Sequence, residues 1–277
     1  MVGISRSFLP VKSDIVFRLL FADERNTEFL IGFLQSVLLL PDDDYEDIEI
    51  LDPHLLREFD SDKLGIVDVK VKTKSGKIIH TEIQLSLPVE MKERISYYIA
   101  KLVTEQLGIG DDYSQLKRVV SIIITDNNLI VGDRYHHRFR MYDATAGIEF
   151  SDLIEINTLE LNKLTAGADG SNLYKWARFI AAETEEELEM AAEMNPQIAR
   201  AVVRLRELSA DEKARDLYER REKARRDENS RLRGAEQKGK RDLLLAMIKS
   251  NLSILDIARY TGLSVDEVVQ LTKEASK

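Results

Sequence analysis

The chain has 277 residues, of which 44% are hydrophobic and 32% charged, so it is long enough to bury a core and too apolar to be disordered. Its lack of cysteine excludes disulfides, zinc–thiolate sites and cysteine nucleophiles and is compatible with a reducing compartment, for which we expect the cytoplasm. The formal net charge of −9 argues against a protein that coats nucleic acid by bulk attraction, so any such contact must be local.

The N-terminal region predicts two helices. Ser13 and Asp14 precede a run of spaced apolar residues, which indicates a capped helix start. A second helical pattern covers residues 26–40 and ends at Pro41. An acidic stretch follows, with a short strand expected at residues 48–51.

Two alternating segments then predict a β-hairpin. In residues 66–72 the valines alternate with Asp68 and two lysines, and in residues 78–85 apolar residues alternate with a face that contains Glu82 and Gln84. Each strand is therefore expected to bury one face and to place its polar side chains on the other.

Helical spacing in residues 90–107, an apolar strand pattern at residues 116–125 and a further strand near residues 152–161 complete an α/β pattern. The order of helix, antiparallel hairpin, helix and strand predicts one α/β domain over residues 1–165.

The rest of the chain lacks strand patterning and is expected to be helical. We expect a region with a long charged helix at residues 166–240, interrupted near Gly234 to Gly239, and a small tail at residues 241–277. Residues 211–241 hold twelve Lys/Arg and eight Asp/Glu, which favours a solvated helix of mixed charge but leaves an oligomerisation role open.

The tail pattern is typical of a helix-turn-helix. Ser253 and Ser264 are expected N-caps, Glu267 completes a capping box, and Gly262 follows the first helix. The second helix begins with Asp266 and Glu267, whose carboxylates would meet DNA phosphates, so packing or oligomerisation is favoured over sequence reading.

The hairpin carries the candidate chemistry. If residues 74–76 form a three-residue loop with Gly76 in the left-handed position, Asp68 lies directly opposite Glu82, with Cβ atoms roughly 4.5–5.5 Å apart. Facing carboxylates destabilise a sheet unless a cation or a shared proton compensates, and carboxylate oxygens suit Mg²⁺ or Mn²⁺. Spacing alone is also compatible with two solvated acids.

The residues Leu64-Gly65-Ile66-Val67-Asp68-Val69-Lys70, followed by a glycine turn and Thr81-Glu82-Ile83-Gln84, resemble the core of the recombination-promoting nuclease (Rpn) family, also called PD-(D/E)XK family transposases. Residues 14–21 look like its opening helix, with Arg18 where lysine is usual, and residues 94–98 look like its next helix. The resemblance covers roughly residues 8–165.

This resemblance implies a restriction-endonuclease-like (PD-(D/E)XK) core with a mixed sheet flanked by helices, DNA as substrate, and Asp68 and Glu82 as metal ligands. The catalytic residues would be Asp68, Glu82 and Gln84. Gln84 stands where the wider superfamily has lysine; glutamine cannot act as a base, although its amide can orient water. The resembled family also has glutamine at this place.

Two further residues are possible additions to the site. Lys70 could supply the missing positive charge, or it is only a solubilising strand lysine. Asp14 is either the N-cap of the first helix, which its position favours, or an added acidic ligand. His80 shares the face of Glu82 and could contact substrate, although a lone histidine on a strand is more often structural or solvated. His136 and His137 are placed in a polar loop without a role.

We therefore expect a Mg²⁺- or Mn²⁺-dependent DNA endonuclease, associated with recombination or mobile elements. A catalytically silent DNA-binding or regulatory protein on a nuclease scaffold is the alternative, suggested by Gln84 and the acidic net charge. A homodimer is a further hypothesis, because many DNA nucleases cut both strands as dimers. A membrane is not an expected partner, since no run of about 18 apolar residues occurs.

Overall fold

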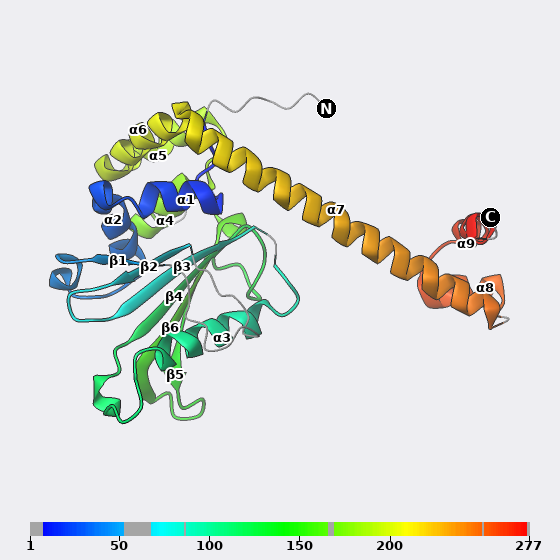
Figure 1. Cartoon of the computed structure of the whole chain (residues 1–277), viewed down its shortest axis with the longest axis horizontal. Coiled ribbons are helices and arrows are strands. Elements are labelled where there is room, and N and C mark those ends of the chain that lie inside the picture. Colours follow the sequence, from blue (N-terminus) through cyan, green and yellow to red (C-terminus); the bar gives the residue numbers. More distant parts are fainter. Residues whose placement is uncertain (1–7, 53–67, 86, 166–168, 251, 276–277) are drawn as a thin grey trace. The chain divides into compact units, whose positions relative to one another are not determined.

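The chain divides into two compact units, residues 1–218 and 219–277. The computed structural model describes residues 8–52, 68–85, 87–165, 169–250 and 252–275 (Figure 1). The start of the predicted strand at residues 66–72 and the residues 64–67 of the family resemblance lie outside the described residues.

A six-stranded mixed sheet lies at the centre of the first unit, with strand order β1-β2-β3-β4-β6-β5. The strands β3, β4 and β6 are mutually parallel, and the remaining strands are antiparallel to their neighbours. The strands are β1 (Glu49–Leu51), β2 (Val69–Lys72), β3 (Ile78–Gln84), β4 (Val119–Thr125), β5 (His136–Tyr142) and β6 (Glu149–Glu160).

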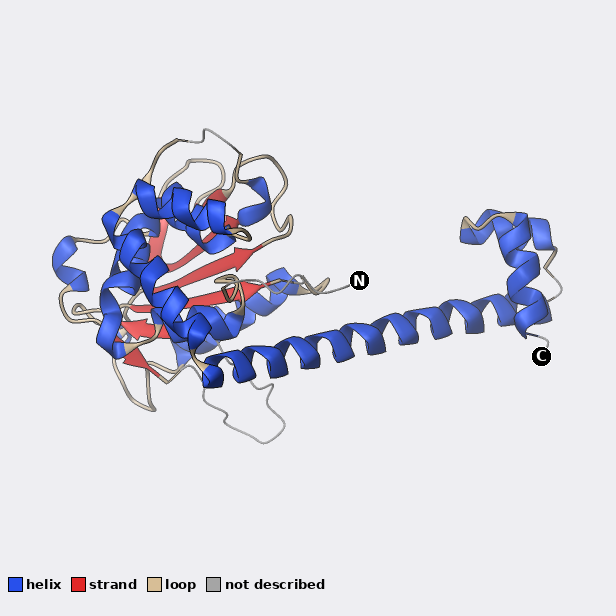
Figure 2. Ribbon diagram, turned by 90° about the horizontal axis from the view of Figure 1, so that it is seen from above, coloured by secondary structure: helices blue, strands red, loops and turns tan. Residues whose placement is uncertain are grey.

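Helices cover both faces of this sheet, α3 on one face and the other helices of the first unit on the opposite face (Figures 1 and 2). They are α1 (Asp14–Phe21), α2 (Thr27–Val37), α3 (Met91–Thr104), α4 (Asn172–Ala181), α5 (Glu185–Met194) and α6 (Pro196–Ala210). Short 3₁₀ helices occupy Glu24–Asn26, Asp42–Tyr45, Tyr113–Gln115 and Leu161–Lys163. Among the described helices, none combines the length and apolar character needed to cross a bilayer.

The larger core lies between the sheet and the helices α1, α2, α4, α5 and α6. Val69 and Val71 of β2 enter it, and Trp176 of α4 is 1% exposed there. The opposite face packs its apolar residues against α3, for example Val119 against Leu102. Every residue of β4 is therefore buried, which explains why its sequence is mostly apolar.

The boundary predicted at residue 165 does not coincide with a division between the compact units. Leu173, Leu188 and Leu205, from α4, α5 and α6, belong to the same core as the sheet. These helices lack strand patterning but carry apolar stripes that pack against one another and against α1 and α2.

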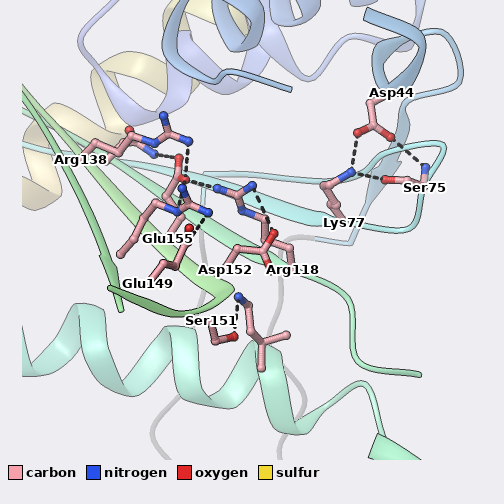
Figure 3. A network of polar contacts seen from close by, with 12 residues as sticks. Asp44, Ser75, Lys77, Arg118, Arg138, Glu149, Ser151, Asp152 and Glu155 are labelled. Atoms are coloured by element: carbon pink, nitrogen blue, oxygen red, sulfur yellow. Dashed lines mark hydrogen bonds and ion pairs between the residues drawn. The ribbon is translucent and has the colours of Figure 1, made fainter. Parts of the chain in front are cut away.

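The segment that contains His136 and His137 is an edge strand, β5, and not the expected loop. Its inward face is charged: Arg138 lies 2.9 Å from the buried carboxylate of Glu155, which Arg118 also contacts (Figure 3). Burial raises the pKa of Glu155, but the bond from Asn157 and these arginines outweigh it, so the net shift is downward. An ion-pair network thus replaces the apolar alternation that identifies a strand in sequence.

The helix α7 (Glu212–Lys249) runs through Gly234 and Gly239, where a break was expected. Each glycine destabilises a helix by about 1 kcal/mol relative to alanine. In a helix of 38 residues, two such positions do not prevent helix formation.

The second unit ends in a small helical cluster. Leu244 of α7 packs with Ile257 of α8 (Ile254–Thr261) and Val268 of α9 (Val265–Ala275). The predicted caps are confirmed: Ser253 Oγ accepts from Asp256 N at 3.1 Å, and Ser264 N donates to Glu267 Oε2 at 2.8 Å. Gly262 adopts φ +70° directly after α8, as expected for the break between the two helices.

Candidate active site

The β2–β3 hairpin has the predicted register. Thr73 N donates to Lys77 O at 2.9 Å, and Val69 pairs with Thr81. Gly76 adopts φ +87°, the conformation that a three-residue loop requires of its last residue. Continued by one residue, this register sets Asp68 opposite Glu82.

Asp68 is held against the backbone on both sides of Glu82. Its N–H donates to Thr81 O at 3.1 Å, and its Oδ2 accepts from Ile83 N at 2.6 Å. The carboxylate is therefore fixed beside β3, where that strand carries Glu82.

The surroundings of Asp68 disfavour its charged form. Burial raises its pKa to about 7, and the nearby negative charges of Asp14 and Glu82 act in the same direction. The bond from Ile83 N and the positive charge of Arg18 lower the pKa but do not offset burial. Near neutral pH this acid is thus poised between protonated and ionised.

Glu82 projects from the sheet toward α3, and its side chain is only 3% exposed. Its Oε1 accepts from Arg94 Nη2 at 2.8 Å and from Gln84 Nε2. Its Oε2 is buried and has no hydrogen-bond partner among the described residues. Burial raises the pKa of Glu82 despite the opposing effects of Arg94 and Gln84.

Arg94 forms the ion pair with Glu82. It lies in the first turn of α3, and its guanidinium carbon is 5.2 Å from the ring centroid of Tyr98, one helical turn later. Residues 94–98 resemble a family helix, but the sequence alone gives Arg94 no role. Its contact with Glu82 depends on how α3 packs against β3.

The model of the PD-(D/E)XK nuclease family transposases matches residues 11–235. The chain belongs to this family. No curated protein matches it, and no solved structure does. The mixed sheet flanked by helices is accordingly the expected PD-(D/E)XK α/β fold with a helical C-terminal region, and the protein is nuclease-like.

Asp14 of this PD-(D/E)XK chain is not the N-cap of the first helix. Ser13 has that position, without a side-chain cap bond, and Asp14 is the first helical residue. Its Oδ1 accepts from Ile15 N at 2.9 Å, and its charge raises the pKa of Asp68. The start of α1 thus brings a third carboxylate into the electrostatic environment of the two strand acids.

Lys70 is engaged elsewhere. Its ammonium lies 3.5 Å from the carboxylate of Glu105, just after α3, and both side chains are largely buried. The cationic side chain that pairs with Glu82 is therefore Arg94 and not Lys70.

Among the described residues, no histidine contributes an exposed side chain to this face. His80 is fully buried, and burial together with the charge of Lys70 lowers its pKa to about 3, which favours the structural role over a contact with substrate. His136 bonds to Asn157 at 3.1 Å, and His137 lies 3.7 Å from Glu160.

The chemistry of the two acids fits a hard divalent cation, although no cluster of three or more His, Asp or Glu side chains suited to a metal occurs within the described residues. The acids are adjacent and largely buried, and the pKa of each is raised. Glu82 Oε2 has no protein partner in the described part of the chain. A cation there would satisfy that oxygen and favour both charged forms, so Asp68 and Glu82 are the residues that would hold a metal.

Proposed function

We propose that this protein is a divalent-metal-dependent endodeoxyribonuclease, associated with recombination or mobile elements. Asp68 and Glu82 would hold Mg²⁺ or Mn²⁺, with Gln84 as the third catalytic residue. The observation that carries this proposal is the pair of buried acids on a hairpin of a PD-(D/E)XK chain, with Glu82 Oε2 lacking a partner among the described residues.

The electrostatics of the pair supports this assignment. Ionising Asp68 places a second negative charge beside Glu82 in a buried position, which costs free energy without a compensating cation. When bound there, a divalent metal would polarise the phosphoryl group and make water a stronger nucleophile at neutral pH.

Gln84 and Arg94 together can supply the two functions of the lysine found at position 84 in the wider superfamily, namely orienting water and providing positive charge. Gln84 cannot take up a proton, but its amide bonds to Glu82 and can orient a water molecule. Arg94 supplies the positive charge, and because its side chain is 36% exposed it can also reach a phosphate oxygen. Both residues hold Glu82 Oε1 and leave Oε2 for a metal.

Plasmid nicking tests the proposal. Purified protein with supercoiled DNA and Mg²⁺ or Mn²⁺ should give nicked product that a chelator abolishes. Asp68→Asn and Glu82→Gln, which keep side-chain shape, should each lower the rate by at least about a hundredfold. Glu49→Gln on β1, whose side chain is 64% exposed, is the matched control and should cut normally. Nicking that persists in both site variants would sink the assignment.

A catalytically silent DNA-binding or regulatory protein is the second candidate, favoured by Gln84 in place of lysine. It predicts that the protein binds DNA while no divalent metal elicits nicking. Calorimetric titration of Mn²⁺ into wild type and Asp68→Asn separates the cases further, because a silent scaffold without a metal site would show the same heats for both.

A further inference from the structure

The helix α7 carries a continuous cationic face between residues 223 and 241. At about 100° per residue, five cations fall within roughly 120° of the helix circumference. They are Lys223, Arg226, Arg233, Lys240 and Arg241. We call these five residues the α7 stripe.

The acids of this segment lie away from the stripe. Asp227, Glu228 and Glu236 are the acidic residues between positions 223 and 241, and at the same angular spacing each falls outside the cationic face. The uncharged residues that share the face are polar: Asn229, Ser230 and Gln237. A helix of evenly mixed charge would not separate its charges in this way.

The stripe is accessible. Every residue from 223 to 241 is exposed, and the surface is hollowed beside Ser230 and Gly234, where side chains are small. Lys240 pairs with Glu236 at 2.7 Å, whereas Lys223 and Arg233 form no ion pair among the described residues.

The two units also differ in net charge, and the unit that contains most of α7 is the positive one. Residues 219–277 hold 14 Lys/Arg and 10 Asp/Glu, which leaves 26 and 39 for residues 1–218. The first unit, which contains the two acids, thus has a formal net charge of 26 − 39 = −13, and the second has 14 − 10 = +4.

From this arrangement we propose that the α7 stripe is a binding surface for the phosphate backbone of duplex DNA. The stripe spans about 27 Å along the helix, at 1.5 Å per residue, and so can meet several successive phosphates. It would bind without reading sequence, because long cationic side chains on one helix face contact phosphates and not a set of base edges. The inference rests on the proposed function for the identity of the polyanion.

A second copy of the chain fits this surface poorly. A coiled-coil partner requires apolar residues at the 3–4 spacing, but that spacing runs through Arg226, Ser230, Arg233, Gln237 and Lys240. Pairing two such faces would also bring like charges together. Charge complementarity therefore selects a polyanion.

The test measures the binding of full-length protein to a short fluorescent duplex by anisotropy, in EDTA so that cleavage cannot occur, over a range of KCl concentrations. The stripe variant Lys223→Gln/Arg226→Gln/Arg233→Gln should bind at least about tenfold more weakly at low salt. The plot of log K against log[KCl] should also flatten by about 2 to 3.

The control variant Arg225→Gln/Arg231→Gln/Lys238→Gln removes the same charge from other faces of α7 and should keep nearly wild-type affinity and slope. Glutamine has a helix propensity close to that of lysine and arginine, and far-UV circular dichroism checks that both variants keep the helix.

Three outcomes would overturn the proposal: equal losses in both variants, which would indicate bulk charge; no loss in either; or a lower solution mass of the stripe variant alone, which would indicate a second copy. The variant Asp68→Asn distinguishes the nicking assay from the binding assay. It should abolish nicking and bind DNA normally in EDTA, so failure of the stripe and failure of the nuclease assignment give different results.

Discussion

At the scale of single residues, sequence reasoning found the acids but not all of their partners. The shared face of Asp68, Glu82 and Gln84 follows from the alternation of two strands and one turn, all local in sequence, whereas their proposed roles rest on the family resemblance. Arg94 could not be assigned, because its contact with Glu82 joins a helix to a strand across a packed interface. Asp14 was misplaced by one residue at the start of α1, and helix ends are the least determined part of a helical pattern.

The raised pKa of Asp68 predicts a pH-dependent stability in the absence of metal. Since its folded-state pKa of about 7 lies above the usual value of an aspartic acid, the native state holds this proton more tightly than the unfolded state. Asp68 should therefore reduce the free energy of unfolding as pH rises from about 4 to 7, by up to about 4 kcal/mol.

Urea unfolding in EDTA at pH 5.5 and pH 8 measures this effect. Wild type should lose more stability over this interval than Asp68→Asn, and Mg²⁺ should restore part of the loss at pH 8. Equal pH dependence of the two proteins would show that Asp68 is not the titrating group.

Arg94 is expected to tune the charge of Glu82. Removing its guanidinium in Arg94→Gln takes away an effect that lowers the pKa of Glu82, so that pKa should rise further above its ordinary value. The affinity for Mn²⁺, measured by calorimetry, should then fall most at the acidic end of the pH range. Arg94→Lys keeps the charge and should fall between wild type and Arg94→Gln; a pH-independent loss would indicate a purely structural role.

At the scale of elements, the sequence predicted what its local patterns determine. The hairpin register follows from a three-residue loop with one glycine, and the apolar β4 follows from cover on both faces. The strand β5 escaped prediction because its inward residues are arginines that pair with Glu155. The long α7 escaped because two glycines are a weak helix-breaking signal when no proline accompanies them.

The turn glycine supplies a prediction at this scale. Gly76→Ala should destabilise the first unit by about 1–2 kcal/mol, because an L-residue at φ +87° is strained and its Cβ would lie 3.3 Å from Lys117 Cγ. Gly76→Asn should recover part of the loss, since asparagine tolerates the left-handed region.

Thermal or urea unfolding measures both changes. Gly239→Ala on α7, where an added Cβ meets nothing within 4 Å, is the control and should stabilise its helix by up to about 1 kcal/mol. If Gly76→Ala unfolds like wild type, the left-handed conformation at Gly76 does not determine the register of the hairpin.

At the scale of the whole molecule, the proposed catalytic site and the proposed DNA-binding surface lie in two units with separate cores. The large core is built from residues between Phe8 and Ala214, whereas the cluster around Leu244 is made only of residues from the second unit. All residues of the candidate active site lie in the first unit, and the α7 stripe lies in the second. Chemistry and duplex affinity should therefore be separable.

A fragment of residues 1–218 tests this separation. Because it retains the whole sheet, both helical layers and the two acids, we expect it to unfold cooperatively at a temperature within a few degrees of the full chain. It should nick plasmid at saturating protein with a rate close to wild type, but require a higher protein concentration to do so, because the stripe is missing.

The solution mass of the fragment, compared with that of the full chain, also tests the homodimer hypothesis. A dimer that persists in residues 1–218 would assign the interface to the first unit, whereas a dimer that dissociates would assign it to residues 219–277. A fragment that does not fold, or that needs no more protein than the full chain, would contradict the division of labour between the two units.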